Sequence, residues 1–146
     1  MRIACLGFLV IALSWAAAAP VAHASTPATP QSWLAGTCSA ISALQHHSER
    51  ATTSRAILTV DGKALLAATS SAPSALPHGN AIASLLHAQA ASFLRYVAAH
   101  RSSSTAALAA RTKSIGASFV HIARLYPSAE LDSAIDQSPT CALVHG

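Results

Sequence analysis

Residues 33–44 read WLAGTCSAISAL, and this helical pattern contains one of the three cysteines of the chain. The apolar residues recur at steps of three and four: Leu34, Cys38, Ile41 and Leu44. Because this spacing places side chains on one face of a helix, we expect a helix over residues 31 to about 49, with Ser32 as its cap. Cys38 lies on the face that is expected to be buried. A disulfide at Cys38 would therefore hold this helix from inside the core.

Three later segments show helical patterns as well. We expect Asn80 to cap a helix whose apolar stripe Gln89 interrupts and His100 continues. The stripe consists of Ile82, Leu85, Leu86, Phe93, Tyr96 and Val97. The next helix covers about residues 105–126, where residues at intervals of seven form two series. These series are Leu108, Ile115 and Ile122, and Thr112, Phe119 and Tyr126. A short helix over residues 128–137 follows and carries Leu131 and Ile135.

Residues 51–69 fit two structures. Asp61-Gly62 is a strong hairpin dipeptide, and apolar residues flank it on both sides. Those apolar residues come in consecutive pairs and do not alternate, however, and residues 63–68 are strong helix formers. Because glycine inside a helix costs only about 1 kcal/mol, we favour one helix with a weak point at Gly62.

These segments predict an all-α protein. Four amphipathic helices with connections of a few residues form an antiparallel four-helix bundle with a short C-terminal helix, in a single domain over residues 31–146. Pro73 and Pro77 place a loop before the third helix. Aromatic residues make up only 5% of the chain and the stripes are rich in alanine, so the core should bury little area per residue.

The N-terminal residues have the three parts of a secretory signal peptide. Arg2 supplies a positive charge, residues 3–19 form an apolar run, and Ala22 and Ala24 are the small residues that a signal peptidase recognises. We therefore expect residues 1–24 to be a cleaved signal peptide. An uncleaved membrane anchor is the alternative, but the run is short for a bilayer, which needs about 20 apolar residues. Cleavage would leave an extracytoplasmic protein with no membrane span.

Cleavage would also leave a linker and one cysteine pair. Residues 25–30 are rich in proline and threonine and should form an extended linker, with sugar on Thr26 or Thr29 as a further possibility. Cys38 and Cys141 then remain near the two ends of one domain. In an oxidising compartment such a pair predicts a disulfide. The closed loop of about 100 residues would contribute on the order of 4–5 kcal/mol to stability.

Residues 32–144 resemble a group of small exported proteins and lipoproteins of actinobacteria. In that group an aromatic residue and a cysteine open the first helix, and a Pro-x-Gly motif precedes the third. The group ends in a pattern like Glu-Leu-x-x-Ala-hydrophobic-x-x-x-Pro-x-Cys. Here these are Trp33 with Cys38, Pro77-His78-Gly79, and Glu130-Leu131-Asp132-Ser133-Ala134-Ile135 through Pro139-Thr140-Cys141. The resemblance implies an all-helical fold and a Cys38–Cys141 bridge, and it implies no activity. This chain is basic where many of those proteins are acidic.

Charge and motifs argue against several function classes. Nine Lys and Arg stand against five Asp and Glu, but the cations are scattered singly, without the clustering of a nucleic-acid groove. Ser118 follows Gly116 but lacks the second glycine of a nucleophile elbow. The carboxylates are too few and too local for a catalytic pair, and no glycine-rich phosphate loop is present. We therefore expect no enzyme, no catalytic residue and no metal site.

Tyr96 and His100 are the strongest candidates for ligand binding. They are four residues apart, hence neighbours on one helix face, and His100 is in phase with the apolar stripe. A small secreted helical protein with such a pair is distantly similar to the mycobacterial haem carriers. The interpretation that we favour is structural: Tyr96 packs at the edge of the bundle and His100 complements the helix dipole.

The other histidines fit a binding site less well. His46 and His47 are adjacent and point about 100° apart on a helix, so they cannot easily share a metal ion. His87 and His121 fall off their apolar stripes and should be solvated. His78 sits in the loop of the Pro-x-Gly motif, where we expect a turn residue.

The leading hypothesis is an exported, non-enzymatic helical protein without a cofactor that binds a partner or a small apolar ligand at the cell envelope. The first alternative is a secreted haem or metal carrier that uses Tyr96 and His100. The second is a structural protein of the envelope.

Intact mass spectrometry of the protein that the cell releases tests export and the bridge together. The expected mass is that of a chain starting at Ser25, lower by two hydrogens than its reduced form, because one disulfide replaces two thiols. A released chain that still starts at Met1, or that has free thiols at both Cys38 and Cys141, would contradict this prediction.

Overall fold

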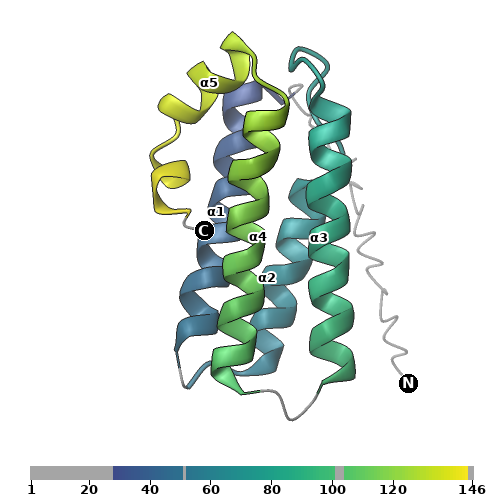
Figure 1. Cartoon of the computed structure of the whole chain (residues 1–146), viewed down its shortest axis with the longest axis vertical. Coiled ribbons are helices and arrows are strands. Elements are labelled where there is room, and N and C mark those ends of the chain that lie inside the picture. The colour runs from purple at the N-terminus through teal and green to yellow at the C-terminus, as the bar shows by residue number, and fades with distance from the viewer. Residues whose placement is uncertain (1–27, 51, 101–103, 145–146) are drawn as a thin grey trace, which may run out of the picture.

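A computed structural model describes residues 28–50, 52–100 and 104–144, and every regular element in these ranges is a helix. The helices are α1 (Pro30–Glu49), α2 (Arg55–Ala68), α3 (Gly79–Ala99), α4 (Thr105–Leu125), α5 (Ala129–Asp136) and the 3-10 helix η1 (Pro139–Leu143). Figure 1 shows the four long helices side by side, with α5 and η1 against α1. Each long helix contacts the next, and α1 also contacts α4, so the packing is consistent with a helical bundle. The all-α prediction is confirmed.

The predicted signal peptide, residues 1–24, lies outside the described residues, as do residues 25–27 of the predicted linker. Within the described part of the chain, no helix combines the length and the apolar character that a membrane crossing requires.

α1 starts slightly earlier than predicted, and Thr29 caps it. The Thr29 hydroxyl accepts a hydrogen bond from the Ser32 N–H at 3.1 Å, and the Ser32 hydroxyl accepts one from the Thr29 N–H at 3.0 Å. The prediction of Ser32 as the cap is therefore wrong, because Ser32 is the third helical residue of a reciprocal capping box. Pro30 takes the first helical position, where its missing N–H leaves no hydrogen bond unmade.

α2 passes through Asp61 and Gly62, so the helix prediction is confirmed and the hairpin alternative is wrong. Gly62 is buried where α2 meets α3, and a Cβ atom there would lie 2.8 Å from Cδ2 of Leu94 and 3.3 Å from Cδ1 of Phe93. Glycine therefore allows the two helices to approach closely. The neighbouring Asp61 side chain turns toward α1 and accepts a 2.7 Å hydrogen bond from Nδ1 of His47.

α3 begins at Gly79, and the prediction that Asn80 caps it is wrong. The cap position is His78, in the left-handed conformation (φ 55°, ψ 13°) and without a side-chain capping bond. A Cβ atom at Gly79 would lie 2.9 Å from Cβ of Ala72 and 3.4 Å from the Pro73 carbonyl oxygen. The preceding loop therefore lies so close to the start of α3 that position 79 has no room for a side chain.

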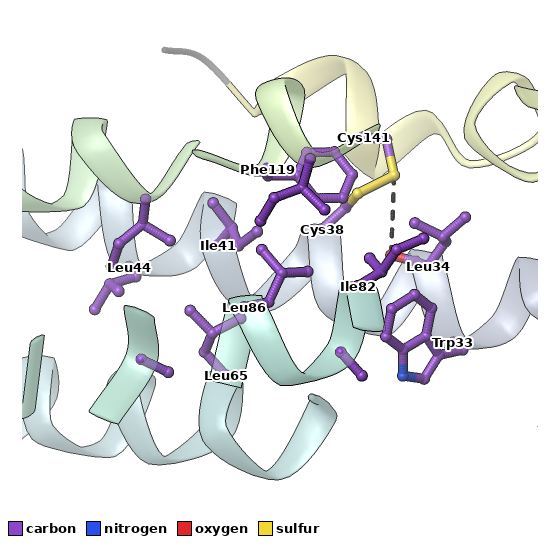
Figure 2. Packing of buried hydrophobic residues seen from close by; sticks show 14 of the residues in the cluster. Trp33, Leu34, Cys38, Ile41, Leu44, Leu65, Ile82, Leu86, Phe119 and Cys141 are labelled. Carbon is purple, nitrogen blue, oxygen red and sulfur yellow. Dashed lines mark hydrogen bonds between the residues drawn. A yellow bond between two sulfur atoms is a disulfide. The ribbon is translucent and has the colours of Figure 1, made fainter. Parts of the chain in front are cut away.

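The hydrophobic core is one cluster drawn from every helix of the described chain (Figure 2). Its large members are Trp33, Leu34, Ile41 and Leu44 of α1, Leu58 and Leu65 of α2, Leu76 of the loop before α3, Ile82, Leu86, Phe93 and Val97 of α3, Leu108, Ile115, Phe119 and Ile122 of α4, and Leu131 of α5. The series at intervals of seven in α4 is thus buried as predicted, with Tyr126 half-buried. Leu85 is not part of the core: it is 42% exposed, because it points about 100° away from Leu86.

A polar contact crosses the interface between α1 and α4 inside this core. The hydroxyls of Ser48 and Thr112 are 2.6 Å apart and both residues are buried. Ser48 also donates to the Gln45 carbonyl at 2.8 Å, and the Gln45 amide donates to the Thr112 carbonyl at 3.4 Å. Because a shift of either helix would break these buried bonds, they help to set the alignment of α1 against α4.

The Cys38–Cys141 disulfide joins α1 to η1 across 103 residues, as predicted. Both cysteines are buried in the core cluster. The C-terminal segment is further attached to α1 where the Thr140 hydroxyl donates to the Ala35 carbonyl at 3.3 Å. A stable disulfide is typical of proteins that fold in an oxidising compartment.

Removal of the disulfide should lower stability strongly. The double substitution Cys38→Ala and Cys141→Ala should lower the melting temperature by roughly 10 °C or more, because a closed loop of this length contributes on the order of 4–5 kcal/mol. Calorimetry measures the shift, and reduction of the unchanged protein should reproduce it. Equal melting of the oxidised and reduced forms would show that the bond contributes nothing.

Two helical glycines offer a matched test of helix packing. Gly36 on α1 is exposed, and a Cβ atom there meets nothing within 4 Å. Gly36→Ala should therefore raise the free energy of unfolding by about 0.5–1 kcal/mol. Gly62→Ala should be less favourable than Gly36→Ala by about 1 kcal/mol or more, because Leu94 must move. Urea unfolding measures both values, and equal gains would contradict the close approach of α2 and α3.

Candidate functional site

The structure brings Tyr96 and His100 together at the end of α3. Their rings stack with centroids 4.3 Å apart and planes 21° apart, and Nδ1 of His100 donates to the Tyr96 carbonyl at 3.1 Å. Cζ of Arg111 on α4 lies 4.6 Å from the centroid of the Tyr96 ring, within the range of a cation–π contact. The two predicted ligand residues are therefore neighbours in a ring cluster that spans α3 and α4.

The placement of His100 differs from the prediction. α3 ends at Ala99, and His100 leaves the helical path with φ −109° and ψ 70°. Its side chain is exposed, so the expectation that His100 continues the buried stripe is wrong. Tyr96 is half-buried against the core. Because the rings of Tyr96 and His100 stack on each other, in this arrangement they cannot bind the two opposite faces of one haem.

The other histidines of the described chain do not gather at one place. His87 is half-buried, and its Nδ1 donates to the Leu66 carbonyl at 3.1 Å. His121 is exposed as predicted. His47 bonds Asp61, and the ring centroids of His46 and His47 are 5.8 Å apart. Among the residues that the structure describes, no three His, Cys, Asp or Glu side chains gather as a metal site would require.

A groove between α3 and α4 has the composition of a small-ligand site. This open surface groove has a volume of about 400 Å³, and its walls include Leu85, Gln89, Ala117, Ser118, His121 and Leu125. Leu85 is 42% exposed and Leu125 is 57% exposed. On α4 the groove extends from Ser114 to Leu125, about 16 Å at 1.5 Å per residue. Small side chains therefore form its middle, and two large aliphatic side chains stand at one end.

The polar groups in this groove come from both helices and include the hydroxyls of Ser114 and Ser118. Gln89 of α3 offers an amide, which can donate and accept, and His121 of α4 offers an imidazole. Ligand sites in proteins combine mainly apolar walls with a small number of such polar groups, and they enclose about 300–1,000 Å³. The groove can therefore hold an apolar molecule and orient one polar end of it.

A second hollow of similar size lies between α1 and η1. It has a volume of about 490 Å³, and although Ser39, Ser42, His46, Glu49 and Thr140 line it, most of its exposed lining surface is apolar. Its one large aliphatic side chain is Leu143, whereas Leu85, Ile122 and Leu125 all line the α3–α4 groove. The α3–α4 groove is therefore the better candidate for an apolar ligand.

The sequence predicts no site at the groove residues. Its pattern predicts that Leu85 is buried in the apolar stripe and that Gln89 only interrupts this stripe. The interruption was the available signal, because a glutamine on an apolar face indicates that part of the face meets water. Leu125 could not be identified in this way, since its exposure depends on which neighbours α4 has in three dimensions.

The chain matches no protein-family model, no curated protein sequence and no solved structure. No family is therefore identified. What the structure supports is a small all-helical protein with a Cys38–Cys141 disulfide.

Proposed function

We propose that this protein is an exported, non-enzymatic binding protein that holds a small apolar ligand in the α3–α4 groove. The observation that carries the proposal is the pair of exposed leucines, Leu85 and Leu125, at one end of the groove. Large aliphatic side chains at the mouth of a groove gain free energy when a ligand covers them, at about 25 cal/mol per Å² of apolar surface.

The size of the groove favours a small ligand over a protein partner. Its volume of about 400 Å³ lies within the usual range for small-molecule sites. A specific protein interface needs about 800 Å² on each partner, which a groove of this length does not offer alone. Gln89 and His121 would then bind the polar end of the ligand.

In this proposal the four long helices form an antiparallel bundle, and α5 with η1 closes the side of α1. The disulfide supports folding in an oxidising compartment, and an exported protein would reach such a compartment. Membership of the actinobacterial group of small exported proteins belongs to the same proposal, and the Trp33, Cys38 and Cys141 pattern is what supports it.

A neutral fluorescent probe tests the groove. N-phenyl-1-naphthylamine should bind with a saturable rise in fluorescence, and a neutral dye avoids attraction to the basic surface. Leu125→Ser should weaken this binding about five- to tenfold, because it removes most of one apolar wall. The control is Val60→Ser on α2, because Val60 is 65% exposed and does not line the groove. Unsaturable dye binding, or equal weakening by both substitutions, would contradict the proposal.

Haemin separates the first alternative from the proposal. A haem carrier that uses Tyr96 and His100 predicts a Soret shift that is lost in Tyr96→Ala and in His100→Ala. The apolar-ligand proposal predicts that these two substitutions leave dye binding unchanged, because neither residue lines the α3–α4 groove. The structural-protein alternative predicts one abundant envelope partner after crosslinking in the native cell.

A further inference from the structure

The α3–α4 groove leads toward a cation. On α4 the wall of the groove begins at Ser114, and Arg111 lies about one helical turn before that residue. At about 100° per residue, Ser114, Ser118 and Leu125 all point within about 60° of Arg111 around the axis of α4. Arg111 therefore lies on the side of α4 that lines the groove, beyond the end opposite Leu125.

The α3 wall continues in the same direction. Tyr96 follows Leu85 and Gln89 on α3, and at about 100° per residue it points within about 20° of both. Cζ of Arg111 lies 4.6 Å from the centroid of the Tyr96 ring, so the two walls still face each other past the end of the groove. This cation–π contact holds the guanidinium between the two helices, in line with the groove.

Neither wall of the groove contains a carboxylate. The five carboxylates of the chain are Glu49, Asp61, Glu130, Asp132 and Asp136, and none of them belongs to α3 or α4. The three on α5 follow the end of α4 that carries Leu125, away from Arg111 (Figure 1). Arg111 is exposed and forms no ion pair with another residue of the described chain. Its guanidinium can therefore bind an anion that enters the groove.

The other Lys and Arg side chains of these two helices point elsewhere. Lys113 is rotated by about 160° and Arg124 by about 140° from Arg111 around the axis of α4. Arg95 of α3 is rotated by about 100° from Tyr96. Of the four, Arg111 alone is aligned with the groove.

We propose that the ligand of the α3–α4 groove is an aliphatic carboxylate with a polar group between its chain and its anion, such as an N-acyl amino acid. This inference rests on the proposed function, because it specifies the ligand of the same groove. The alkyl chain would pack between Leu85 and Leu125. Its amide would form hydrogen bonds with Gln89 and His121, and its carboxylate would pair with Arg111.

The order of groups along the groove supports this class of ligand. Aliphatic side chains stand at one end, neutral polar side chains follow, and the guanidinium lies past the other end. An N-acyl amino acid presents a chain, an amide and a carboxylate in the same order. Leu125 and Arg111 are separated by about 21 Å along α4, so an elongated molecule is required.

Calorimetric titration with two matched probes tests this assignment. N-decanoylglycine carries the carboxylate, and N-decanoylglycinamide has the same chain and amide but no charge. At low ionic strength the unchanged protein should bind the acid about threefold more tightly, because an exposed charge pair is worth about that factor. Added salt should reduce this preference. Arg111→Gln should abolish the preference and leave the affinity for the neutral probe unchanged.

The matched control is Arg124→Gln, which removes the same kind of side chain from an exposed position on α4 that does not line the groove. This variant should keep the preference for the acid, and so should Arg111→Lys, which keeps the charge. Equal affinities of the unchanged protein for the two probes, no binding of the acid, or equal losses in Arg111→Gln and Arg124→Gln would overturn the assignment.

The neutral dye distinguishes failure of this inference from failure of the proposed function. Saturable dye binding that Leu125→Ser weakens, together with equal affinities for acid and amide, would overturn the carboxylate and leave the groove as a binding site. Unsaturable dye binding together with no binding of either probe would overturn both. Circular dichroism checks that each variant retains its helices.

Discussion

The covalent link between Cys38 and Cys141 is the constraint on which the rest of this molecule depends. The core around it is built with few aromatic rings and several alanines, including Ala83 and Ala90 of α3. Small side chains give each helix little apolar area to bury. The free energy gained by burying apolar surface therefore exceeds the conformational entropy cost of folding by only a small amount. A bond that closes most of the chain into one loop offsets part of that entropy before any packing forms.

Small side chains also determine where the surface is hollow. At Gly62 the missing side chain lets α2 pack closely against α3. On the other side of α3, Ala117 and Ser118 are too short to fill the space beside Leu85. The small side chains that allow tight helix contacts thus also leave the α3–α4 groove open.

Local patterns predicted most of the fold, since helix period, proline positions and a cysteine pair are properties of the chain itself. The helix through Gly62 and the buried series of Leu108, Ile115 and Ile122 followed from such patterns. The α3–α4 groove did not, because it is formed by residues from two helices about thirty positions apart. The position of His100 could not be predicted in this way either. α3 ends at Ala99, and helical spacing does not tell where a side chain points after the helix has ended.

The disulfide has one more consequence, which concerns damage to the chain. The exposed loop between α2 and α3 contains Ser74 and Ala75, and such loops are where proteases cut first. A single cut there falls between the two bonded cysteines, so the two pieces remain one covalent molecule. In surroundings rich in proteases, a nicked copy could keep its helices assembled where an unbridged bundle of the same composition would separate into fragments.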